Sequence, residues 1–202
     1  MYDLKRYFRA VKHFFDAAVN INRLPAPYYQ KHTLLLDFFP EHAAVIETGT
    51  YLGETTSVLA HHCTQVLTLE PYLPLYKYNS RRFRSAENVT VINASSEEGF
   101  EEALSTLCGP IAFWLDGHFS WEGTHGEITN ASPVEHELRV IGDYLDKKLG
   151  PVYVAIDDAR LFTGVDGYPS EIAVKNFANK FGLSFFKFRD IYFLKSQDEN
   201  VV

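Results

Sequence analysis

A short segment with two glycines contains the first residues whose types and spacing could do chemistry. It reads Glu47-Thr48-Gly49-Thr50-Tyr51-Leu52-Gly53 and stands between an apolar run and a helical stretch. Glycine is needed where a strand turns sharply into a helix and the backbone must lie against a ligand. Glu70 ends the next apolar run, 21 residues after Gly49, where a carboxylate can accept both hydroxyls of a ribose. The pattern predicts a nucleotide-type ligand bound by Glu47, Gly49, Thr50, Tyr51, Gly53 and Glu70.

Two kinds of ligand compete for this loop. A dinucleotide requires G-x-G-x-x-G so that its pyrophosphate can lie against the backbone, but Tyr51 occupies the position of the middle glycine. Glu47 would repel a pyrophosphate and would support a cationic ligand or its ammonium group. The loop therefore favours a cationic ligand without phosphate over NAD. The structural alternative is that the glycines only make a tight turn and Glu70 caps a helix.

A second group of titratable residues follows two later apolar runs. Asp116 and His118 come after one run, and Asp157-Asp158 after the next. If these runs are parallel strands, their carboxyl ends meet beside the glycine loop. Three carboxylates at close range repel one another, so either their pKa values rise or a hard cation such as Mg²⁺ binds among them. Because neighbouring strand residues point to opposite faces, Asp157 and Asp158 reach one ion only if the chain turns there.

The histidine has several interpretations. Imidazole is a competent base near neutral pH, so His118 and Asp116 are the candidate catalytic residues. A zinc site from His118, His125 and His136 is disfavoured because their spacings fit no usual zinc pattern. Structural roles, a helix cap for an aspartate and a hydrogen-bonded core position for the histidine, remain as alternatives.

Apolar runs alternate with helical stretches over most of the chain. Strands are expected over 43–48, 65–70, 89–94, 111–116, 152–157, 183–188 and 191–195, and helices over 28–39, 55–62, 73–83, 97–107, 133–149 and 171–181. Continuous apolar runs between helices indicate a parallel sheet covered on both faces. The last two strands are joined by two residues, too few for a parallel crossover, so they form an antiparallel hairpin. The expected fold is α/β, doubly wound and Rossmann-like, with a mainly parallel sheet.

The remaining segments have separate interpretations. Residues 1–27 are expected to form an amphipathic helix over 3–19 and a linker with two prolines, and 28–202 a single α/β domain. The helix is the candidate interface of a homo-oligomer, although its basic side could also touch an acidic membrane. Between Gly117 and Ser132 the sequence predicts a lid or substrate-binding loop. Ser132-Pro133-Val134-Glu135 predicts a capping box.

Composition excludes some classes of partner. The chain of 202 residues has 19 Lys and Arg against 26 Asp and Glu, a net charge of −7. This balance argues against a nucleic-acid partner. The sequence shows neither a secretion signal nor an apolar run long enough to span a membrane, so we expect no stable membrane association. Cys63 and Cys108 form no disulfide pattern, which is typical of a reduced, cytoplasmic setting.

With these motifs, the chain resembles the class I S-adenosylmethionine-dependent methyltransferases over roughly residues 28–195. The E-x-G-x-x-x-G loop resembles their motif I, Glu70 in VLTLEP their acidic motif II, and the closing hairpin their antiparallel seventh strand. Within the class, the chain is similar to the metal-dependent sugar O-methyltransferases of macrolide and aminocoumarin biosynthesis, where an aromatic residue also replaces the middle glycine.

The resemblance implies S-adenosylmethionine as the cofactor and methylation of a hydroxyl on a small molecule such as a sugar. It implies that Ser95 and Ser96 lie at the adenine and that Asp116, Asp157 and Asp158 hold a divalent metal such as Mg²⁺. In that subfamily a second acid, proposed as the base, stands two residues after the first aspartate, and here His118 takes its place. A module that binds a nucleoside or sugar without turnover is the alternative function, and an NAD-dependent oxidoreductase is the less favoured one.

Overall fold

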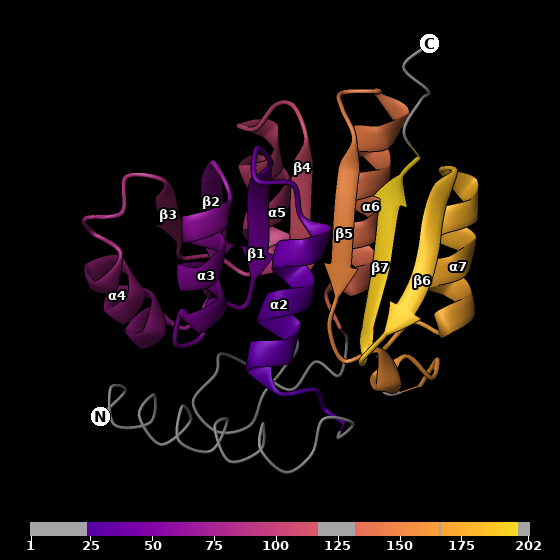
Figure 1. Ribbon diagram of the computed structural model, residues 1–202, viewed down its shortest axis with the longest axis horizontal. Coiled ribbons are helices and arrows are strands. Elements are labelled where there is room, and N and C mark those ends of the chain that lie inside the picture. The colour runs from indigo at the N-terminus through magenta and orange to yellow at the C-terminus, as the bar shows by residue number, and fades with distance from the viewer. Residues whose placement is uncertain (1–23, 117–131, 166, 198–202) are drawn as a thin grey trace.

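The computed structural model describes residues 24–116, 132–165 and 167–197 and shows one sheet flanked by helices on both sides (Figure 1). The strands are β1 (Ala44–Thr48), β2 (Gln65–Leu69), β3 (Val89–Ile92), β4 (Ile111–Leu115), β5 (Val152–Ile156), β6 (Leu183–Phe188) and β7 (Ile191–Ser196). The helices are α2 (Tyr28–Phe38), α3 (Glu54–His62), α4 (Leu73–Arg82), α5 (Ser96–Ser105), α6 (Val134–Asp146) and α7 (Glu171–Lys180), with a 3-10 turn, η1 (Ala159–Leu161). The expected elements within these residues are confirmed, with ends displaced by up to three residues.

The strand order predicts that a ligand binds at the carboxyl ends of the central strands. The order is β3-β2-β1-β4-β5-β7-β6. Strands β1 to β5 pair in parallel, whereas β7 is antiparallel to both β5 and β6. The chain runs outward from β1 to β3 and then returns to start β4 on the other side of β1, so the order reverses between these two strands. Ligands of such sheets bind outside the carboxyl ends of the strands at this reversal.

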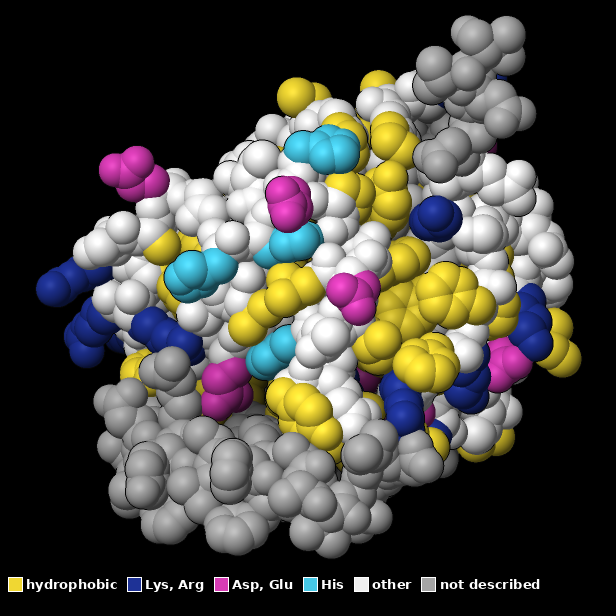
Figure 2. All heavy atoms as spheres, viewed as in Figure 1, with side chains coloured by type: hydrophobic (Ala, Val, Ile, Leu, Met, Phe, Trp, Pro, Cys, Tyr) yellow, Lys and Arg dark blue, Asp and Glu magenta, His cyan; other side chains and the backbone are white. Residues whose placement is uncertain are grey.

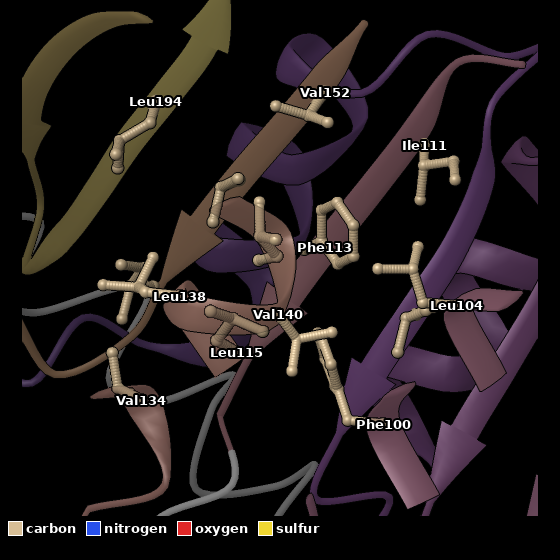
Figure 3. Close-up of a cluster of buried hydrophobic side chains, with 14 of the residues drawn as sticks. Phe100, Leu104, Ile111, Phe113, Leu115, Val134, Leu138, Val140, Val152 and Leu194 are labelled. Atoms are coloured by element: carbon tan, nitrogen blue, oxygen red, sulfur yellow. The ribbon is translucent and has the colours of Figure 1, made fainter. Parts of the chain in front are cut away.

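The apolar runs form the central strands because both of their faces are covered. Every residue of β1 and β4 is buried. One core cluster packs α5, α6 and α7 on one face of the sheet, and it includes Phe100, Phe113, Leu138 and Leu194 (Figure 3). A second cluster packs α2 and α3 on the opposite face. The predicted fold class, a mainly parallel α/β sheet with helices on both faces, is confirmed.

Strands β6 and β7 form the antiparallel hairpin that the two-residue connection between them predicted. Arg189 and Asp190, which join β6 to β7, have φ angles of 50° and 70°. Two-residue hairpins favour turns in which both central residues have positive φ, because this twist matches that of the strands. The prediction of an antiparallel hairpin is therefore confirmed in its pairing and in its turn.

The predicted capping box at Ser132 is wrong. Helix α6 begins at Val134 with Pro133 as its N-cap residue, and the Ser132 hydroxyl accepts only a long hydrogen bond of 3.4 Å from the Val134 N–H. The pattern favoured Ser132 as the cap and Pro133 as the first helical residue, and the structure shifts both by one position. Capping of this kind is found instead at α5, where the Glu98 carboxylate accepts from the Ser95 N–H at 3.2 Å.

Helix α2 lies across the sheet with its N-terminal end at the edge where β1 and β5 end (Figure 1). Near its other end, the ring of Phe38 packs edge-on against Tyr153, Phe186 and Phe193 of β5, β6 and β7. Figure 2 shows a patch of hydrophobic side chains on this face, on the β6 and β7 side of α2. Aromatic packing thus fixes the helix at one end, and its first turn lies at the carboxyl ends of the strands, where the candidate site is.

Several sequence expectations lie outside the described residues. They are the N-terminal helix over 3–19, the loop over 117–131 and His118 within that loop. Within the part of the chain that the structure describes, no helix is long and apolar enough to cross a membrane.

Candidate functional site

The glycine loop turns sharply between β1 and α3. Gly49, Tyr51 and Gly53 have φ angles of 83°, 47° and 71°. The N–H groups of Gly49 and Thr50 donate to the carbonyl of Leu69, at 3.1 and 3.2 Å, which lays the loop against the end of β2. A positive φ is strained for a residue with a side chain, so Tyr51 keeps this conformation only because its neighbours hold it.

Side chains of helix α4 form part of the contacts that keep Tyr51 and the glycine loop in this conformation. The side-chain amide of Asn79 donates to the carbonyl of Tyr51 at 2.6 Å, and the guanidinium of Arg82 donates to the carbonyl of Leu52. A Cβ on Gly53 would lie 2.5 Å from Asn79 Oδ1 and 2.6 Å from Arg82 Nη1. The packing of α4 therefore requires glycine at position 53, and the predicted cofactor contact of Gly53 stays a prediction.

Glu70 joins this loop to the end of β2. Its two carboxylate oxygens accept from the N–H groups of Tyr51 and Tyr72, at 2.8 and 2.9 Å, and the residue is 4% exposed. Burial raises the pKa of Glu70, while these two hydrogen bonds oppose the shift. Each carboxylate oxygen can accept a further hydrogen bond, so the side chain can still receive ribose hydroxyls. The structure brings Glu70 to the loop, and its ribose contact stays a prediction.

Glu47 is buried between β1 and α3. Its carboxylate accepts from the hydroxyl of Thr56 in the first turn of α3. Burial raises the pKa of Glu47 to about 7, the hydrogen bonds with Thr56 and Thr68 oppose this, and nearby Glu70 adds to it. Glu47 thus ties the strand to the helix and is partly protonated near neutral pH, which weakens the attraction to a cationic ligand on which its predicted role depends.

The hydroxyl of Thr48, next in sequence, is a buried polar group without a described partner. Thr48 Oγ1 has no hydrogen bond within residues 24–116, 132–165 and 167–197. It lies where β1 enters the glycine loop. Buried polar groups normally pair, so a hydroxyl in this position is a candidate contact for a bound ligand.

Ser95 and Ser96 begin α5 after β3. Ser96 is buried and donates from its hydroxyl to Glu137 Oε1 of α6 at 2.6 Å. The upstream Asn93 donates from its side chain to the carbonyl of Glu70 at 2.8 Å. These contacts fix the segment beside the end of β2, but they occupy the Ser96 hydroxyl within the protein. The predicted adenine contact of both serines remains a prediction.

The carboxylates at the strand ends do converge. Asp116 directly follows β4 and is half-buried, and the Asp157 N–H donates to the carbonyl of Leu115 on that strand at 3.0 Å. Asp158 has φ 54° and ψ 40°, so the chain turns at this residue as the metal hypothesis required. The Asp158 N–H donates back to Asp157 Oδ1 at 2.8 Å. Both side chains consequently reach one cation.

That cation is an ammonium group of the protein itself. Lys31 Nζ forms an ion pair with Asp157 Oδ2 and lies 3.8 Å from Asp158 Oδ1. Burial lowers the pKa of Lys31, but the carboxylates of Asp157, Asp116 and Asp158 outweigh this and raise it overall. Burial also raises the pKa of Asp157, with Asp116 adding to the shift and Lys31 opposing it.

The predicted metal site at Asp116, Asp157 and Asp158 therefore finds no support. The described residues contain no group of three or more His, Cys, Asp or Glu side chains arranged to hold a metal ion. The physical reason is the ammonium of Lys31, which lies against the carboxylate oxygens that a metal would need. Sequence reasoning offered raised pKa values or a metal ion as the relief of this repulsion and did not consider a lysine of the protein.

Arg160 neutralises the other side of the cluster. Its guanidinium contacts Asp158 Oδ1 at 2.6 Å and also pairs with buried Asp190 of the hairpin turn. The Arg160 N–H donates to Asp190 Oδ1 at 2.7 Å. Burial raises the pKa of Tyr168 to about 12, with Asp158 adding to the shift and Arg160 opposing it, which places the phenol in the field of the same cluster.

Sequence reasoning missed Lys31, Arg160 and Tyr168 as members of this cluster. For Lys31 a signal existed, because it stands four residues before Leu35 and therefore shares the buried stripe of α2. A lysine on a buried stripe needs a carboxylate partner. Arg160 lies in the short turn η1 and Tyr168 in the loop before α7, and the sequence carries no periodic signal at either position. His118, the predicted base, lies outside the described residues.

The comparisons with known proteins identify the fold. No family model matches the chain, and no curated protein matches it. Among solved structures, the N-methyltransferase NodS from Bradyrhizobium japonicum WM9 is 14% identical with a TM-score of 0.54, over 83% of this chain and 94% of that one. Fibrillarin from Aeropyrum pernix, in complex with S-adenosylmethionine, is 12% identical with a TM-score of 0.52, over 84% and 74% of the two chains.

A third neighbour is the 23S rRNA methyltransferase ErmE, 19% identical with a TM-score of 0.50, over 86% of this chain and 70% of that one. These structural neighbours are class I S-adenosylmethionine-dependent methyltransferases. At such low identity the likeness shows the fold, which agrees with the fold that the resemblance implied.

Proposed function

We propose that this protein is an S-adenosylmethionine-dependent methyltransferase that methylates a hydroxyl of a small molecule. The observation that carries the proposal is the carboxylate of Glu70 at the glycine loop, where it accepts the Tyr51 N–H at the carboxyl ends of β1 and β2. This arrangement lies on a fold shared with a fibrillarin solved with S-adenosylmethionine. Ligands of such sheets bind at this edge.

The residues present fit this cofactor. The carboxylate of Glu70 would accept the ribose hydroxyls, and the backbone of Gly49 and Thr50 would lie along the ligand. Tyr51 in place of a middle glycine leaves less room for a pyrophosphate, which disfavours NAD. The buried hydroxyl of Thr48 supplies a further polar contact. Glu47 would support the ligand's ammonium group only with the part of its carboxylate that is charged near neutral pH.

The reaction consists of an in-line displacement. The acceptor oxygen forms a bond to the methyl carbon, the bond from that carbon to sulfur breaks, and the hydroxyl proton passes to a base. Bound S-adenosylmethionine supplies an electrophilic methyl group on a positively charged sulfur. The protein's task is alignment, which a rigid edge of the sheet provides. We propose His118 as the base. Asp116, two residues earlier in the sequence, directly follows β4.

The acceptor is proposed to be small and hydroxylated, for example a sugar. This follows the resemblance to sugar O-methyltransferases and the net charge of −7, which disfavours RNA. No step of this proposal passes through a metal. Binding without turnover is the alternative, and it shares the same cofactor contacts.

Calorimetric titration with S-adenosylmethionine, S-adenosylhomocysteine and NAD tests the cofactor. We expect heat with the first two ligands at one site per chain and none with NAD. Glu70→Ala should abolish this heat, whereas Glu101→Ala, a matched change at an exposed position of α5, should leave it intact. Heat with NAD alone would overturn the proposal. Formation of S-adenosylhomocysteine in the presence of sugars or phenols then separates turnover from binding.

A further inference from the structure

The carboxylate cluster at the ends of β4 and β5 already contains its own cation. Lys31 Nζ pairs with Asp157 Oδ2 and lies 3.8 Å from Asp158 Oδ1. The side chains of Lys31 and Asp157 are 6% and 1% exposed, and that of Asp158 is 11% exposed. This ion pair differs from an exposed salt bridge, because both charged groups have been removed from water and each needs the other to offset its desolvation.

The placement of Lys31 is built into the fold. Lys31 and Leu35 are the buried residues of α2, so the ammonium points into the protein from the same stripe that anchors the helix. Its partner Asp157 is 126 positions away in sequence. Helix α2 is held against the sheet by Phe38 at its far end, and the hydrogen bond between His32 Nε2 and Thr55 Oγ1, at 3.2 Å, ties its first half to α3.

Asp157 and Asp158 have further partners besides Lys31. Arg160 contacts Asp158 at 2.6 Å and pairs with Asp190. The two carboxylate oxygens of Asp157 have different partners. Oδ1 accepts a hydrogen bond from the Asp158 N–H, and Oδ2 pairs with the Lys31 ammonium. Asp157 Oδ2 and Asp158 Oδ1 thus share one positive charge, as they would share a metal ion.

We propose that Lys31 is a built-in cation that takes the place of a divalent metal among Asp116, Asp157 and Asp158. Mg²⁺ requires oxygen ligands at about 2.0–2.1 Å in near-octahedral geometry, and an ammonium seated on the same oxygens excludes it. The site therefore works without a metal. Lys31 acts as a positioning residue that holds Asp157 and Asp158 in their turn.

The proposal concerns the same edge of the sheet as the proposed methyl transfer, but its test does not depend on that activity. Removing the ammonium leaves carboxylates around an empty volume, which is the chemistry that binds a hard cation. Lys31→Ala is consequently expected to gain a metal site that the natural protein lacks. Mn²⁺ is the probe, because its binding is followed directly by electron paramagnetic resonance.

The full chain, freed of metals by chelation, is titrated with Mn²⁺ as wild type, Lys31→Ala and Lys31→Ala/Asp157→Asn. We expect one Mn²⁺ per chain in Lys31→Ala, bound at least about tenfold more tightly than by the wild type. The added Asp157→Asn change should abolish that binding. Lys175→Ala, which removes the lysine of an exposed pair with Glu171, is the matched control and should bind like the wild type.

Thermal unfolding provides the second readout. Mn²⁺ should raise the Tm of Lys31→Ala and leave that of the wild type unchanged, and Lys31→Ala/Asp157→Asn should be more stable than Lys31→Ala without metal. If Lys31→Ala folds only in the presence of Mn²⁺, the proposal is supported.

Three results would overturn the proposal. They are tight Mn²⁺ binding by the wild type that Asp157→Asn abolishes, a folded Lys31→Ala that gains no site, and a Lys31→Ala that fails to fold even with Mn²⁺. If the wild type does not bind S-adenosylmethionine but the variants show the expected Mn²⁺ binding, the proposed function is overturned and this inference is still supported.

Discussion

Three buried acids of the candidate site have partners of different kinds. Glu47 is held by a hydroxyl of Thr56, Glu70 by backbone N–H groups and Asp157 by the ammonium of Lys31. The kind of partner decides how much negative charge remains for a ligand. A backbone N–H leaves the carboxylate its charge, whereas a full ammonium cancels it. This difference supports the proposed contact between Glu70 and the ribose of the cofactor.

Glu70→Gln tests this at the residue scale. In the variant, an amide NH₂ group replaces one of the two oxygens that accept from the N–H groups of Tyr51 and Tyr72. One buried hydrogen bond is then lost, and two donors face each other. We expect the free energy of unfolding to fall by about 1–3 kcal/mol. The affinity for S-adenosylmethionine should fall with it, because the ribose loses an acceptor. Urea denaturation and calorimetry measure the two effects.

Glu101→Gln is the control for Glu70→Gln, since Glu101 is exposed on α5. It should change neither quantity. Unchanged cofactor affinity in a folded Glu70→Gln would argue that Glu70 serves only the loop, as the structural alternative holds.

The raised pKa of Glu47 predicts a pH dependence of stability. Burial raises its pKa to about 7 in the folded protein, from about 4.5 when unfolded. The proton is then bound more tightly by the folded state, so this contribution to stability is complete below pH 4.5 and is lost as the pH rises through 7. Glu47→Gln cannot ionise and escapes this loss. At pH 8 the variant should be more stable than the wild type by up to about 3 kcal/mol relative to their difference at pH 4.5.

Urea denaturation of wild type and Glu47→Gln at both pH values measures this difference. All other titrating groups are common to the two proteins, so their contributions cancel in the comparison. A difference in stability that does not change between pH 4.5 and 8 would show that Glu47 ionises in the folded state as it does in water.

At the scale of elements, the glycine loop and α4 behave as one unit. A methyl group on Gly53 would meet Asn79, Arg82 and the ring of Phe83 at 2.5, 2.6 and 2.8 Å. Gly53→Ala should therefore lower the free energy of unfolding by about 2–4 kcal/mol, from the strain at φ 71° and the displaced helix. Because α4 also holds the Tyr51 carbonyl, cofactor affinity should fall too.

Gly182→Ala separates the two causes. Gly182 follows α7 with φ 63°, and a Cβ there meets nothing within 4 Å. Its substitution should cost only the backbone strain, about 1–2 kcal/mol, and leave cofactor affinity unchanged. Equal losses in the two variants, measured by urea denaturation, would mean that the contact between α4 and the loop carries no energy.

The elements could be predicted because their signals are local. The apolar run that forms β4 and the two-residue connection before β7 show their structure within a few residues of sequence. The pair of Lys31 and Asp157 has no such signal, since it joins residues 126 positions apart. The acids could be placed at one edge by topology alone, whereas their cation comes from a helix that precedes the sheet. Sequence reasoning therefore found the negative charges and supplied a metal where the fold supplies a lysine.

At the scale of the whole molecule, the shared fold leaves the substrate open. ErmE, one structural neighbour, is a 23S rRNA methyltransferase, and NodS is an N-methyltransferase. A common sheet carries different chemistries through the residues at its edge and the charge of its surface. For this chain the surface charge is the more general discriminator, because it acts on any polyanion whatever its sequence.

The net charge of −7 predicts that the protein does not bind RNA. Affinity for a phosphate backbone comes from the counterions that clustered Lys and Arg release, and an acidic molecule repels that backbone at long range. Fluorescence anisotropy with a labelled RNA hairpin at about 0.15 M salt should show no binding below about 1 μM protein. Lowering the salt should not induce binding, since weaker screening strengthens repulsion as well as attraction, and a basic RNA-binding protein of similar size serves as the positive control. Saturable binding that weakens linearly with the logarithm of salt concentration would reveal a local basic surface that outweighs the net charge, and the acceptor would then have to be sought among nucleic acids.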